Sequence, residues 1–172
     1  YTTLFRSILD SDSSADYPAE FQEKYVLMEC LSEQKGITTF LVQDPEGKNH
    51  IAKCYERDLW TIADNSSLLD GLDHKGLPKY TESFENENVL ITVREYIEGL
   101  PLDRYAQENE LSVKEITRIC ARICDILAYL HHRDEPIIHR DIKPQNIIIG
   151  PDGSVSLIDF DIARVYRSGH DT

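Results

Sequence analysis

A tight turn between two β-rich runs, with a polar residue at each outer end, is the feature that most restricts how this chain can fold. The run Ile147–Ile149 leads into the turn Gly150–Gly153, and the run Val155–Ile158 follows the turn. Glycine, proline and aspartate at the turn positions are typical of a connection between antiparallel strands. Such a hairpin brings Asn146, before its first strand, close to Asp159, after its second. The sequence therefore predicts that these two side chains face one site.

The residues around this hairpin have the chemistry that phosphoryl transfer requires. Residues 139–146 (HRDIKPQN) supply a carboxylate, an ammonium group and an amide, and Asp159 supplies a second carboxylate. Asp141 can orient a hydroxyl nucleophile and accept its proton, while Lys143 can neutralise charge on the moving phosphoryl group. Asn146 and Asp159 offer oxygen ligands of the kind that Mg²⁺ prefers. The alternative is a surface turn with solvated charges, and the β-rich flanks argue against it.

Both motifs, HRDIKPQN and the segment Asp159–Asp161 (DFD), resemble the catalytic loop and the metal-binding loop of eukaryotic-type, bacterial-like Ser/Thr protein kinases. The resemblance covers residues 25–172 and implies an α+β, protein kinase-like fold. It implies a β-rich N-lobe at 25–94, a hinge at 95–99 and the start of a helical C-lobe at 100–172. The chain is expected to be an N-terminal fragment of such a domain, because no Ala-Pro-Glu-type segment follows the metal-binding loop.

The same resemblance implies a function. It implies transfer of the γ-phosphoryl group of Mg-ATP to a protein hydroxyl, with ATP and Mg²⁺ as cofactors and a protein as substrate. Asp141 and Lys143 take the catalytic positions, and Asn146 and Asp159 take the metal-binding positions. Asn146 also counts among the nucleotide-binding residues, because the metal bridges the phosphates. His139 is expected to hold the loop through its ring nitrogens.

Further residues are assigned to the nucleotide by this resemblance. Lys53, on an expected strand, is the counterpart of the lysine that holds the α- and β-phosphates. Gly36 is the one glycine that remains where the family has a glycine-rich loop, whose backbone N–H groups approach phosphate. Adenine is expected to hydrogen-bond backbone groups near Glu95 and Ile97. The sparse glycine loop predicts weaker nucleotide affinity or a differently shaped lid, and an ordinary hairpin is the alternative for this segment.

The expected ion-pair partner of Lys53 is missing from its usual place. Asn65 falls at the position where the kinase resemblance expects a glutamate on a helix. A neutral amide fixes a lysine less well than a carboxylate does. Asp64 and Glu56 are nearby acids that can substitute for it.

Arg94 and Asp161 also depart from the family pattern. Arg94 stands just before the expected hinge, at a position that is usually apolar or small. It is expected to pair with an acid on the helix that carries Asn65, or with Asp159. Asp161 replaces a glycine whose backbone can take unusual angles. Aspartate tolerates left-handed conformations better than most residues, so the substitution is compatible with activity.

Two other functions remain open at this point. A pseudokinase, which keeps the fold as a binding or regulatory module, is favoured by the sparse glycine loop, by Asn65 and by Asp161. The presence of every group assigned to transfer argues against it. A small-molecule kinase of the aminoglycoside phosphotransferase type is the second alternative. Lys143, two residues after Asp141, favours the protein-kinase pattern over that one.

Periodicity predicts β structure first and helices later. Strands are expected at 25–31, 38–42, 50–55 and 89–96, and helices at about 59–72, 102–107 and 112–132. The last helix begins with Ser112 and Glu115 in the form of a capping box. This order of elements agrees with the fold that the motifs imply.

Residues 1–24 are expected to lie outside the folded domain. Tyr1–Ser7 resembles the translation of a DNA-sequencing adaptor and is treated as a scar. Residues 8–20 are rich in Asp and Ser and lack periodicity. They predict a disordered acidic lead-in that continues through residue 24.

Composition restricts the partners and the compartment. The net charge is -13, from 31 acidic and 18 basic residues. Nucleic acid and anionic membranes attract clusters of Lys and Arg, so neither is an expected partner. The four cysteines have neither zinc nor disulfide spacing, and Cys120 and Cys124, one helical turn apart, are expected in the core. No apolar run is long enough to cross a bilayer. These features predict a cytoplasmic protein.

Overall fold

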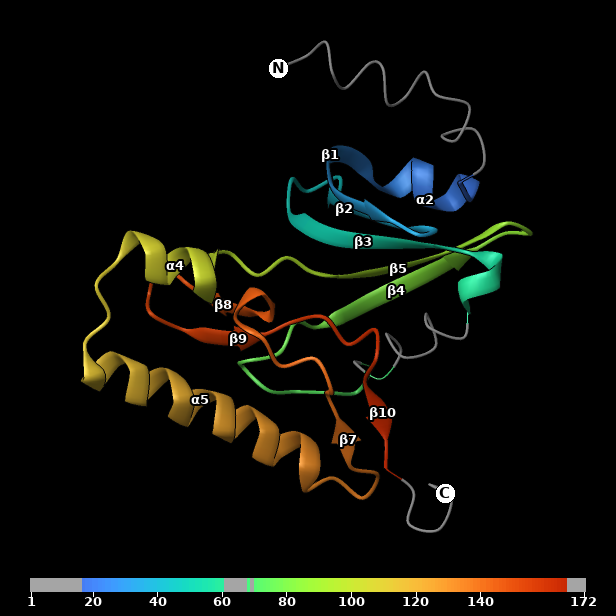
Figure 1. Ribbon diagram of the computed structural model, residues 1–172. Coiled ribbons are helices and arrows are strands. Elements are labelled where there is room, and N and C mark those ends of the chain that lie inside the picture. Colours follow the sequence, from blue (N-terminus) through green and yellow to red (C-terminus); the bar gives the residue numbers. More distant parts are fainter. Residues whose placement is uncertain (1–16, 61–67, 69, 167–172) are drawn as a thin grey trace. The chain divides into compact units, whose positions relative to one another are not determined.

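The computed structural model describes residues 17–60, 68 and 70–166 (Figure 1). Within these ranges the chain forms two compact units. The first contains residues 17–60 and 80–96, and the second contains residues 68, 70–79 and 97–166. The predicted α+β class is confirmed, because a five-stranded antiparallel sheet in the first unit is followed by a long helix in the second.

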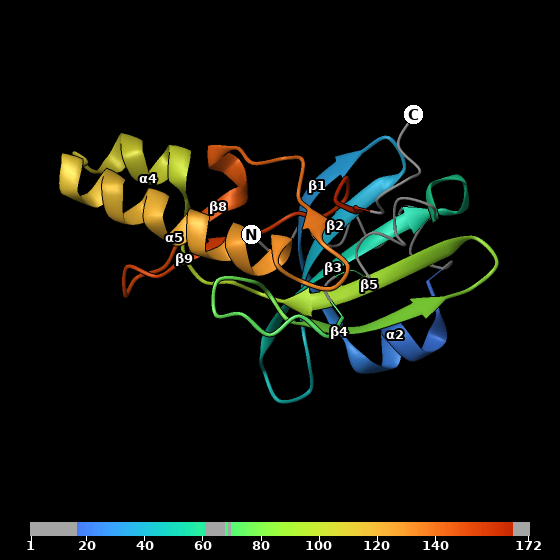
Figure 2. The ribbon, with the colours of Figure 1, turned by 90° about the horizontal axis from the view of Figure 1, so that it is seen from below.

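An antiparallel sheet is the main element of the first unit (Figures 1 and 2). Its strands are β1 (Val26–Gln34), β2 (Ile37–Gln43), β3 (Asn49–Glu56), β4 (Tyr80–Glu85) and β5 (Val89–Glu95), in the order β1-β2-β3-β5-β4. Four of these strands confirm the sequence prediction. The sequence pattern misses β4, because its residues YTESFE are mostly polar and only Phe84 among them is buried.

A short helix, α2 (Ala19–Lys24), closes one face of this sheet. Phe21 from the helix is 1% exposed and packs with Tyr25, Phe40 and Phe84 in one aromatic-rich cluster. The rings of Phe21 and Phe84 meet edge to face, with 5.6 Å between their centroids. The prediction of a disordered lead-in through residue 24 is therefore wrong for residues 19–24. The acidic composition concealed the aromatic side chain whose burial holds the helix on the sheet. The adaptor-like residues 1–7 lie outside the described part of the chain.

We expect Phe21→Leu to lower the free energy of unfolding by about 1 kcal/mol, because leucine keeps an apolar side chain but loses the ring contacts. Urea denaturation followed by circular dichroism would measure the change. The control is Glu23→Leu, an exposed position on the same helix, which should leave the unfolding free energy unchanged. Equal effects from the two variants would contradict the docking role of Phe21.

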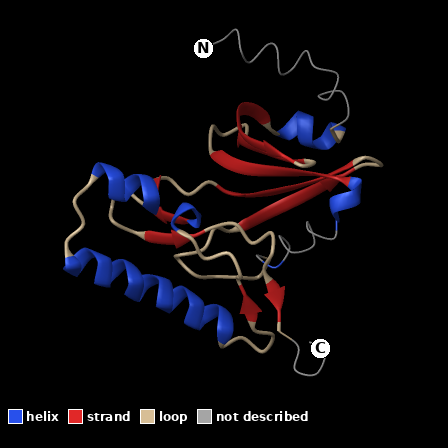
Figure 3. Ribbon diagram, viewed as in Figure 1, coloured by secondary structure: helices blue, strands red, loops and turns tan. Residues whose placement is uncertain are grey.

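The second unit contains two helices and two small sheets (Figure 3). Its elements are β6 (Leu100–Pro101), α4 (Leu102–Glu108), α5 (Val113–His131), β7 (Ile137–Ile138), the 3₁₀ turn η4 (Pro144–Asn146), β8 (Ile147–Ile149), β9 (Val155–Leu157) and β10 (Arg164–Val165). Strands β6, β8 and β9 form one sheet, and β7 pairs with β10. The predicted hairpin is confirmed as the β8–β9 pair.

Helix α5 confirms the predicted capping box. The Ser112 side chain accepts the N–H of Glu115, and the Glu115 carboxylate accepts the N–H of Ser112 at 3.0 Å. The helix buries Ile119, Ile126 and Leu130. The placement of Cys120 and Cys124 in the core is wrong, since both are exposed on another face of the helix. Neither α5 nor any other helix in the described ranges is long and apolar enough to cross a bilayer.

Residues 70–79, directly before β4, pack with the second unit, although the sequence pattern assigns them to the N-lobe at 25–94. The N–H of Leu157 donates to the Gly76 carbonyl at 2.8 Å, and the N–H of Asp73 donates to the Tyr129 hydroxyl at 2.9 Å. The first bond holds the backbone of Gly76 against β9. The second attaches the segment to α5. The helix predicted at about 59–72 falls largely outside the described residues. Next to it the structure describes a 3₁₀ turn, η2 (Arg57–Leu59).

Candidate active site

The β8–β9 hairpin brings the two predicted polar segments of the second unit together. The N–H of Ile158 donates to the carbonyl of Asn146 at 2.9 Å. Asn146 is 5% exposed and ends η4 directly before β8. Asp159 follows Ile158, so it lies one residue from the backbone partner of Asn146. The backbones of Asn146 and Asp159 therefore lie close together, as the hairpin pattern predicts.

His139 holds the loop from a buried position, as the sequence predicts. Its ring is 1% exposed, and Nδ1 lies 3.3 Å from the N–H nitrogen of Asp141. Because Nδ1 accepts this N–H, the proton of the ring is on Nε2, which donates to the Ile158 carbonyl at 3.1 Å. The edge of the ring meets Phe160, with 4.6 Å between centroids. Burial lowers the pKa of His139, so the ring is neutral near pH 7.

Asp141 receives two side-chain donors on a single carboxylate oxygen. Lys143 Nζ lies 2.7 Å from Oδ2, and Asn146 Nδ2 donates to the same oxygen at 2.9 Å. Asn146 Nδ2 also donates to the Asp141 carbonyl at 2.9 Å. The hydrogen bond to Asp141 raises the pKa of Lys143. Among the described residues, both hydrogen bonds to the Asp141 carboxylate go to Oδ2, which leaves Oδ1 as the oxygen that can accept a ligand hydroxyl.

Two residues of this site have left-handed backbone, Arg140 and Asp159, each with φ of 69°. Asp161, where the sequence pattern places the special backbone, is not among the positive-φ residues of the described chain. The glycine-like conformation therefore falls on Asp159, the predicted metal ligand, and not on Asp161. Phe160, between Asp159 and Asp161, is 2% exposed, and its carbonyl accepts the N–H of Ala163 at 3.0 Å. This buried ring anchors the loop.

A contact that sequence reasoning misses connects η4 to α4. Gln145 Nε2 donates to Asp103 Oδ2 at 2.9 Å. The two residues are 42 positions apart in the chain. No local pattern signals such a bond, because it depends on how β6 and β8 pair.

In the first unit, Lys53 lies on β3, in the middle of the sheet. Its cross-strand neighbours are Thr39 on β2 and Thr92 on β5. Residues directly opposite each other in an antiparallel sheet share a face, so these three side chains point to the same side. The aromatic-rich cluster under α2 contains Ala52 and Cys54, which alternate with Lys53 along the strand. Lys53 therefore projects from the face opposite that cluster.

Gly36 belongs to a two-residue turn between β1 and β2 rather than to an open loop. Lys35 and Gly36 have φ of 47° and 79°, and Gln34 pairs with Ile37. Two left-handed residues in a two-residue connection are typical of a type I′ turn. A Cβ at position 36 would lie 2.9 Å from Glu56 Oε2. Turn geometry and this close approach explain the glycine, and its contact with phosphate stays a prediction.

The residues expected near the adenine lie at the end of β5 and directly after it: Glu95 is the last residue of the strand. Arg94 is half-buried, and its Nη1 donates to the Glu95 carbonyl at 3.3 Å. Ile97 is half-buried two residues further on. Asn65, at the expected glutamate position, lies outside the described residues. The pairing of Arg94 with an acid on that helix or with Asp159 stays a prediction.

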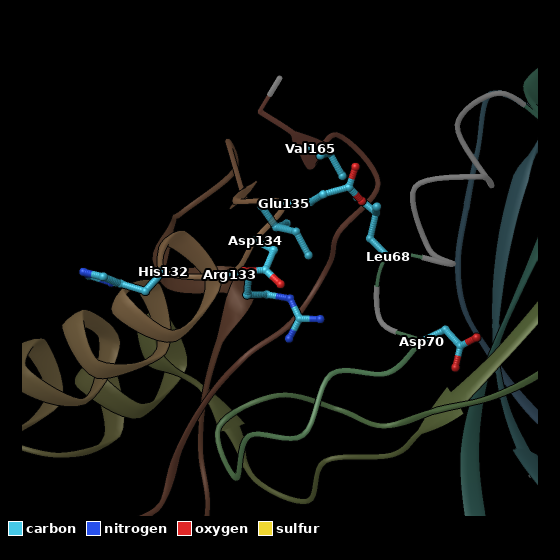
Figure 4. Close-up of a pocket in the computed structure, with 8 residues that line it drawn as sticks. Leu68, Asp70, His132, Arg133, Asp134, Glu135 and Val165 are labelled. Atoms are coloured by element: carbon cyan, nitrogen blue, oxygen red, sulfur yellow. The ribbon is translucent and has the colours of Figure 1, made fainter. Parts of the chain in front are cut away.

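A pocket of about 520 Å³ lies at the C-terminal end of α5 in the second unit (Figure 4). It is lined by Leu68, Asp70, His132, Arg133, Asp134, Glu135, Ile137 and Val165. Figure 4 shows the side chain of His132 directed away from the other labelled residues. None of these lining residues is a predicted catalytic or metal-binding residue. The pocket is therefore not the candidate active site.

The donor set of the second unit suits Mg²⁺. Asn146 and Asp159 offer an amide oxygen and a carboxylate, which are hard oxygen ligands. The described residues contain no group of three or more His, Cys, Asp or Glu side chains that could enclose a metal ion. Mg²⁺ is usually bound by one or two protein carboxylates together with substrate phosphates, so it needs no such group.

We expect His139→Phe to lower the free energy of unfolding by about 2 kcal/mol near neutral pH. Phenylalanine keeps a ring beside Phe160, but it leaves the Ile158 carbonyl and the Asp141 N–H without their partners. Urea denaturation of the wild type and the variant would measure the difference.

The same pair of proteins tests the protonation state of the ring. The pKa of folded His139 lies below the unfolded value of about 6.5, so the unfolded state gains the proton first as the pH falls. The stabilisation is complete above the unfolded pKa and is lost below it. The difference between wild type and His139→Phe should therefore shrink from about pH 7.5 to about pH 5.5. A difference that grows on acidification would contradict the neutral ring.

Comparison with known proteins identifies the family. Residues 47–172 match the family model described as Protein kinase domain. The chain is similar to Serine/threonine-protein kinase Nek1 of Mus musculus, at 34% identity over 156 residues, which are 85% of this chain and 13% of that protein. It is similar to Serine/threonine-protein kinase 36 of Pongo abelii, at 34% identity over 110 residues, 63% of this chain and 8% of that protein. It is also similar to Serine/threonine-protein kinase PrkC of Bacillus subtilis (strain 168), at 36% identity over 98 residues, 56% of this chain and 15% of that protein.

The chain spans only 8 to 15% of the length of these relatives. The family match nevertheless covers more than half of the chain. It includes Lys53 on β3 and the whole segment from His139 to Asp161. The chain belongs to the protein kinase family.

Proposed function

We propose that this protein is a Ser/Thr protein kinase, which transfers the γ-phosphoryl group of ATP to a hydroxyl group of a protein substrate. The observation that carries the proposal is the cluster of Asp141, Lys143 and Asn146, in which two donors meet one carboxylate oxygen. The Ser/Thr kinases among the similar proteins support the choice of hydroxyl. The chain supplies the N-lobe, the hinge and the start of the C-lobe of the catalytic domain.

Asp141 is the residue that orients the nucleophile. Lys143 and Asn146 hold its Oδ2, so Oδ1 accepts the O–H of the substrate. The hydroxyl oxygen bonds to the γ-phosphorus while the bond from this phosphorus to ADP breaks, and the hydroxyl proton passes to Asp141. The side chain of Lys143 is 46% exposed. Its ammonium group can therefore turn toward the moving phosphoryl group and neutralise its charge.

Asn146 and Asp159 are the residues that would hold Mg²⁺. The bound ion would neutralise charge on the β- and γ-phosphates. Asn146 is oriented for this role, because its amide nitrogen donates twice to Asp141 and its side-chain oxygen remains for a ligand. The left-handed backbone of Asp159, directly after the hairpin, sets the direction of its carboxylate.

The nucleotide is held in this proposal by Lys53, at its α- and β-phosphates, and by backbone groups of Glu95 and Ile97, at its base. The turn at Gly36 covers the phosphates. A two-residue turn offers fewer backbone N–H groups to phosphate than an open glycine loop does. The affinity for ATP is therefore expected to be lower than a full glycine loop would give.

Four free cysteines and an excess of acidic residues support a cytoplasmic protein that does not bind nucleic acid. Both features agree with a kinase that meets its ATP and its protein substrate in a reducing compartment.

The test is phosphate transfer from γ-labelled ATP by the full-length gene product, to itself and to a generic basic protein, with Mg²⁺ and with EDTA. Phosphoamino-acid separation of the product identifies the acceptor. We expect Mg²⁺-dependent label on serine or threonine. Label on tyrosine would overturn the choice of hydroxyl.

Two further outcomes distinguish the alternatives. Binding of Mg·ATP without transfer to any protein would favour a pseudokinase, to which the tight turn at Gly36 also points. Transfer to aminoglycosides but to no protein would favour a small-molecule kinase. Lack of both binding and transfer would overturn the proposal altogether.

A further inference from the structure

Arg94 brings a guanidinium group to the end of β5, beside the carbonyl group of the next residue. Its Nη1 donates to the Glu95 carbonyl at 3.3 Å, and the side chain is half-buried. The strand register places Arg94 opposite Ile51 on β3 and opposite Tyr80 on β4. These three residues therefore share one face of the sheet. Ile51 is 5% exposed, so the stem of Arg94 starts beside a buried apolar neighbour.

Lys53 projects from the same face of the sheet. It follows Ile51 by two positions on β3, and its cross-strand partner, Thr92, precedes Arg94 by two positions on β5. Side chains alternate along a strand, so Lys53 and Arg94 lie diagonally on neighbouring strands, within reach of long side chains. The face that carries the phosphate-binding lysine of the proposed function thus carries a second cation, nearer to the residues assigned to the base.

We propose that Arg94 is a specificity-determining residue for the purine base, and that it admits 6-oxopurine nucleoside triphosphates, GTP and ITP, alongside ATP. This inference rests on the proposed function, which puts the base at the backbone of Glu95 and Ile97. A guanidinium group has five N–H donors and no acceptor. It therefore adds a donor at the edge of the base, where the Glu95 carbonyl is the acceptor it already contacts.

The substituent at position 6 of the purine determines which hydrogen bonds this edge of the base can make. The 6-amino group of adenine is a donor, and it competes with Arg94 for the Glu95 carbonyl. The 6-oxo group of guanine or hypoxanthine is an acceptor, which an arginine can bind directly. A correct hydrogen-bonding pair of this type is worth about tenfold or more in affinity. Arg94 should therefore lower the preference for ATP rather than abolish nucleotide binding.

The test is the ratio of dissociation constants for ATP, ITP and GTP, measured by calorimetry with Mg²⁺ on the full-length gene product. ITP isolates the position-6 substituent, because it lacks the 2-amino group of GTP. We expect wild-type affinities for ATP and ITP within about tenfold of each other. In Arg94→Met the ratio should move toward ATP by about tenfold or more. Arg94→Thr, with a β-branched residue that suits a strand, provides the same measurement if methionine disturbs folding.

The matched control is Arg57→Met. Arg57 Nη1 also donates to a backbone carbonyl in the first unit, that of Glu87, at 2.7 Å. This variant should leave the ATP to ITP ratio unchanged. An unchanged ratio in the Arg94 variants, with ATP still bound, overturns the role of Arg94 and leaves the proposed kinase function intact. Failure of the wild type to bind any of the three nucleotides overturns both.

Discussion

In Asp141→Asn the rate of phosphate transfer should fall by about 10²–10⁴-fold, while Mg·ATP still binds. Asparagine has the size of aspartate and can still accept the Asn146 amide, but it cannot take up the hydroxyl proton. It also removes the ion pair with Lys143, whose N–O distance is 2.7 Å. The loss should appear in kcat and not in the KM for ATP, because the contact with the reacting hydroxyl strengthens in the transition state.

Asp152→Asn is the matched control for this substitution. Asp152 lies on the exposed turn of the β8–β9 hairpin, in the same unit, and its Oδ1 accepts the N–H of Ser154 at 2.9 Å. Asparagine makes the same turn bond, so activity and stability should not change. Equal losses in both variants, or full activity in Asp141→Asn, would contradict the assigned role of Asp141.

Gly99→Ala should lower the free energy of unfolding by about 4 kcal/mol and reduce transfer as well. Gly99 has φ of +148°, a conformation that side chains rarely adopt. A Cβ there would also collide with the carbonyl oxygen of Ile149 and lie 2.8 Å from Ile148 Cγ2. Backbone cannot yield as a flexible side chain does, so the pairing of Leu100 with Ile149 must shift. That pairing holds the strand that directly follows Asn146.

Gly47→Ala separates the cost of the backbone conformation from the cost of the steric collision. Gly47 has φ of +82°, and a Cβ at this position would meet nothing within 4 Å. The variant should therefore show the backbone cost alone, about 1–2 kcal/mol, with transfer unchanged. Thermal or urea denaturation of both variants would make the comparison. A smaller loss in Gly99→Ala than in Gly47→Ala would show that β6 and β8 can move apart at little cost.

The features that were predicted from the sequence depend on residues close together in the chain. The capping box of Ser112 and Glu115 needs two residues three positions apart, and the structure confirms it. The β8–β9 hairpin needs one turn between two apolar runs. The loop at 139–146 has a spacing that chance rarely supplies. In each case the interacting residues are only a few positions apart, so a local sequence pattern is sufficient to predict the feature.

The predictions that were wrong concern features that depend on residues far apart in the sequence. Helix α2 is stable because Phe21 meets the ring of Phe84 on β4 and packs in one buried cluster with Phe40 of β2. Residues 8–24 alone contain no pattern that predicts these distant partners. Cys120 and Cys124 fit an apolar helical pattern, yet α5 buries Ile126 and Leu130 instead. The left-handed backbone falls on Asp159 and not on Asp161, because the hairpin and the buried ring of Phe160 direct the chain there.

The sequence by itself determined which residues this chain offers for the predicted catalysis, and in what order, because eight residues and one short hairpin are enough to define them. Only the tertiary structure decided which oxygen of Asp141 is held, which nitrogen of His139 carries the proton, and that Arg94 donates to the Glu95 carbonyl. Hydrogen-bond directions depend on the atoms that packing brings within about 3 Å of one another. Such distances follow from strand register and burial, which are properties of the folded chain.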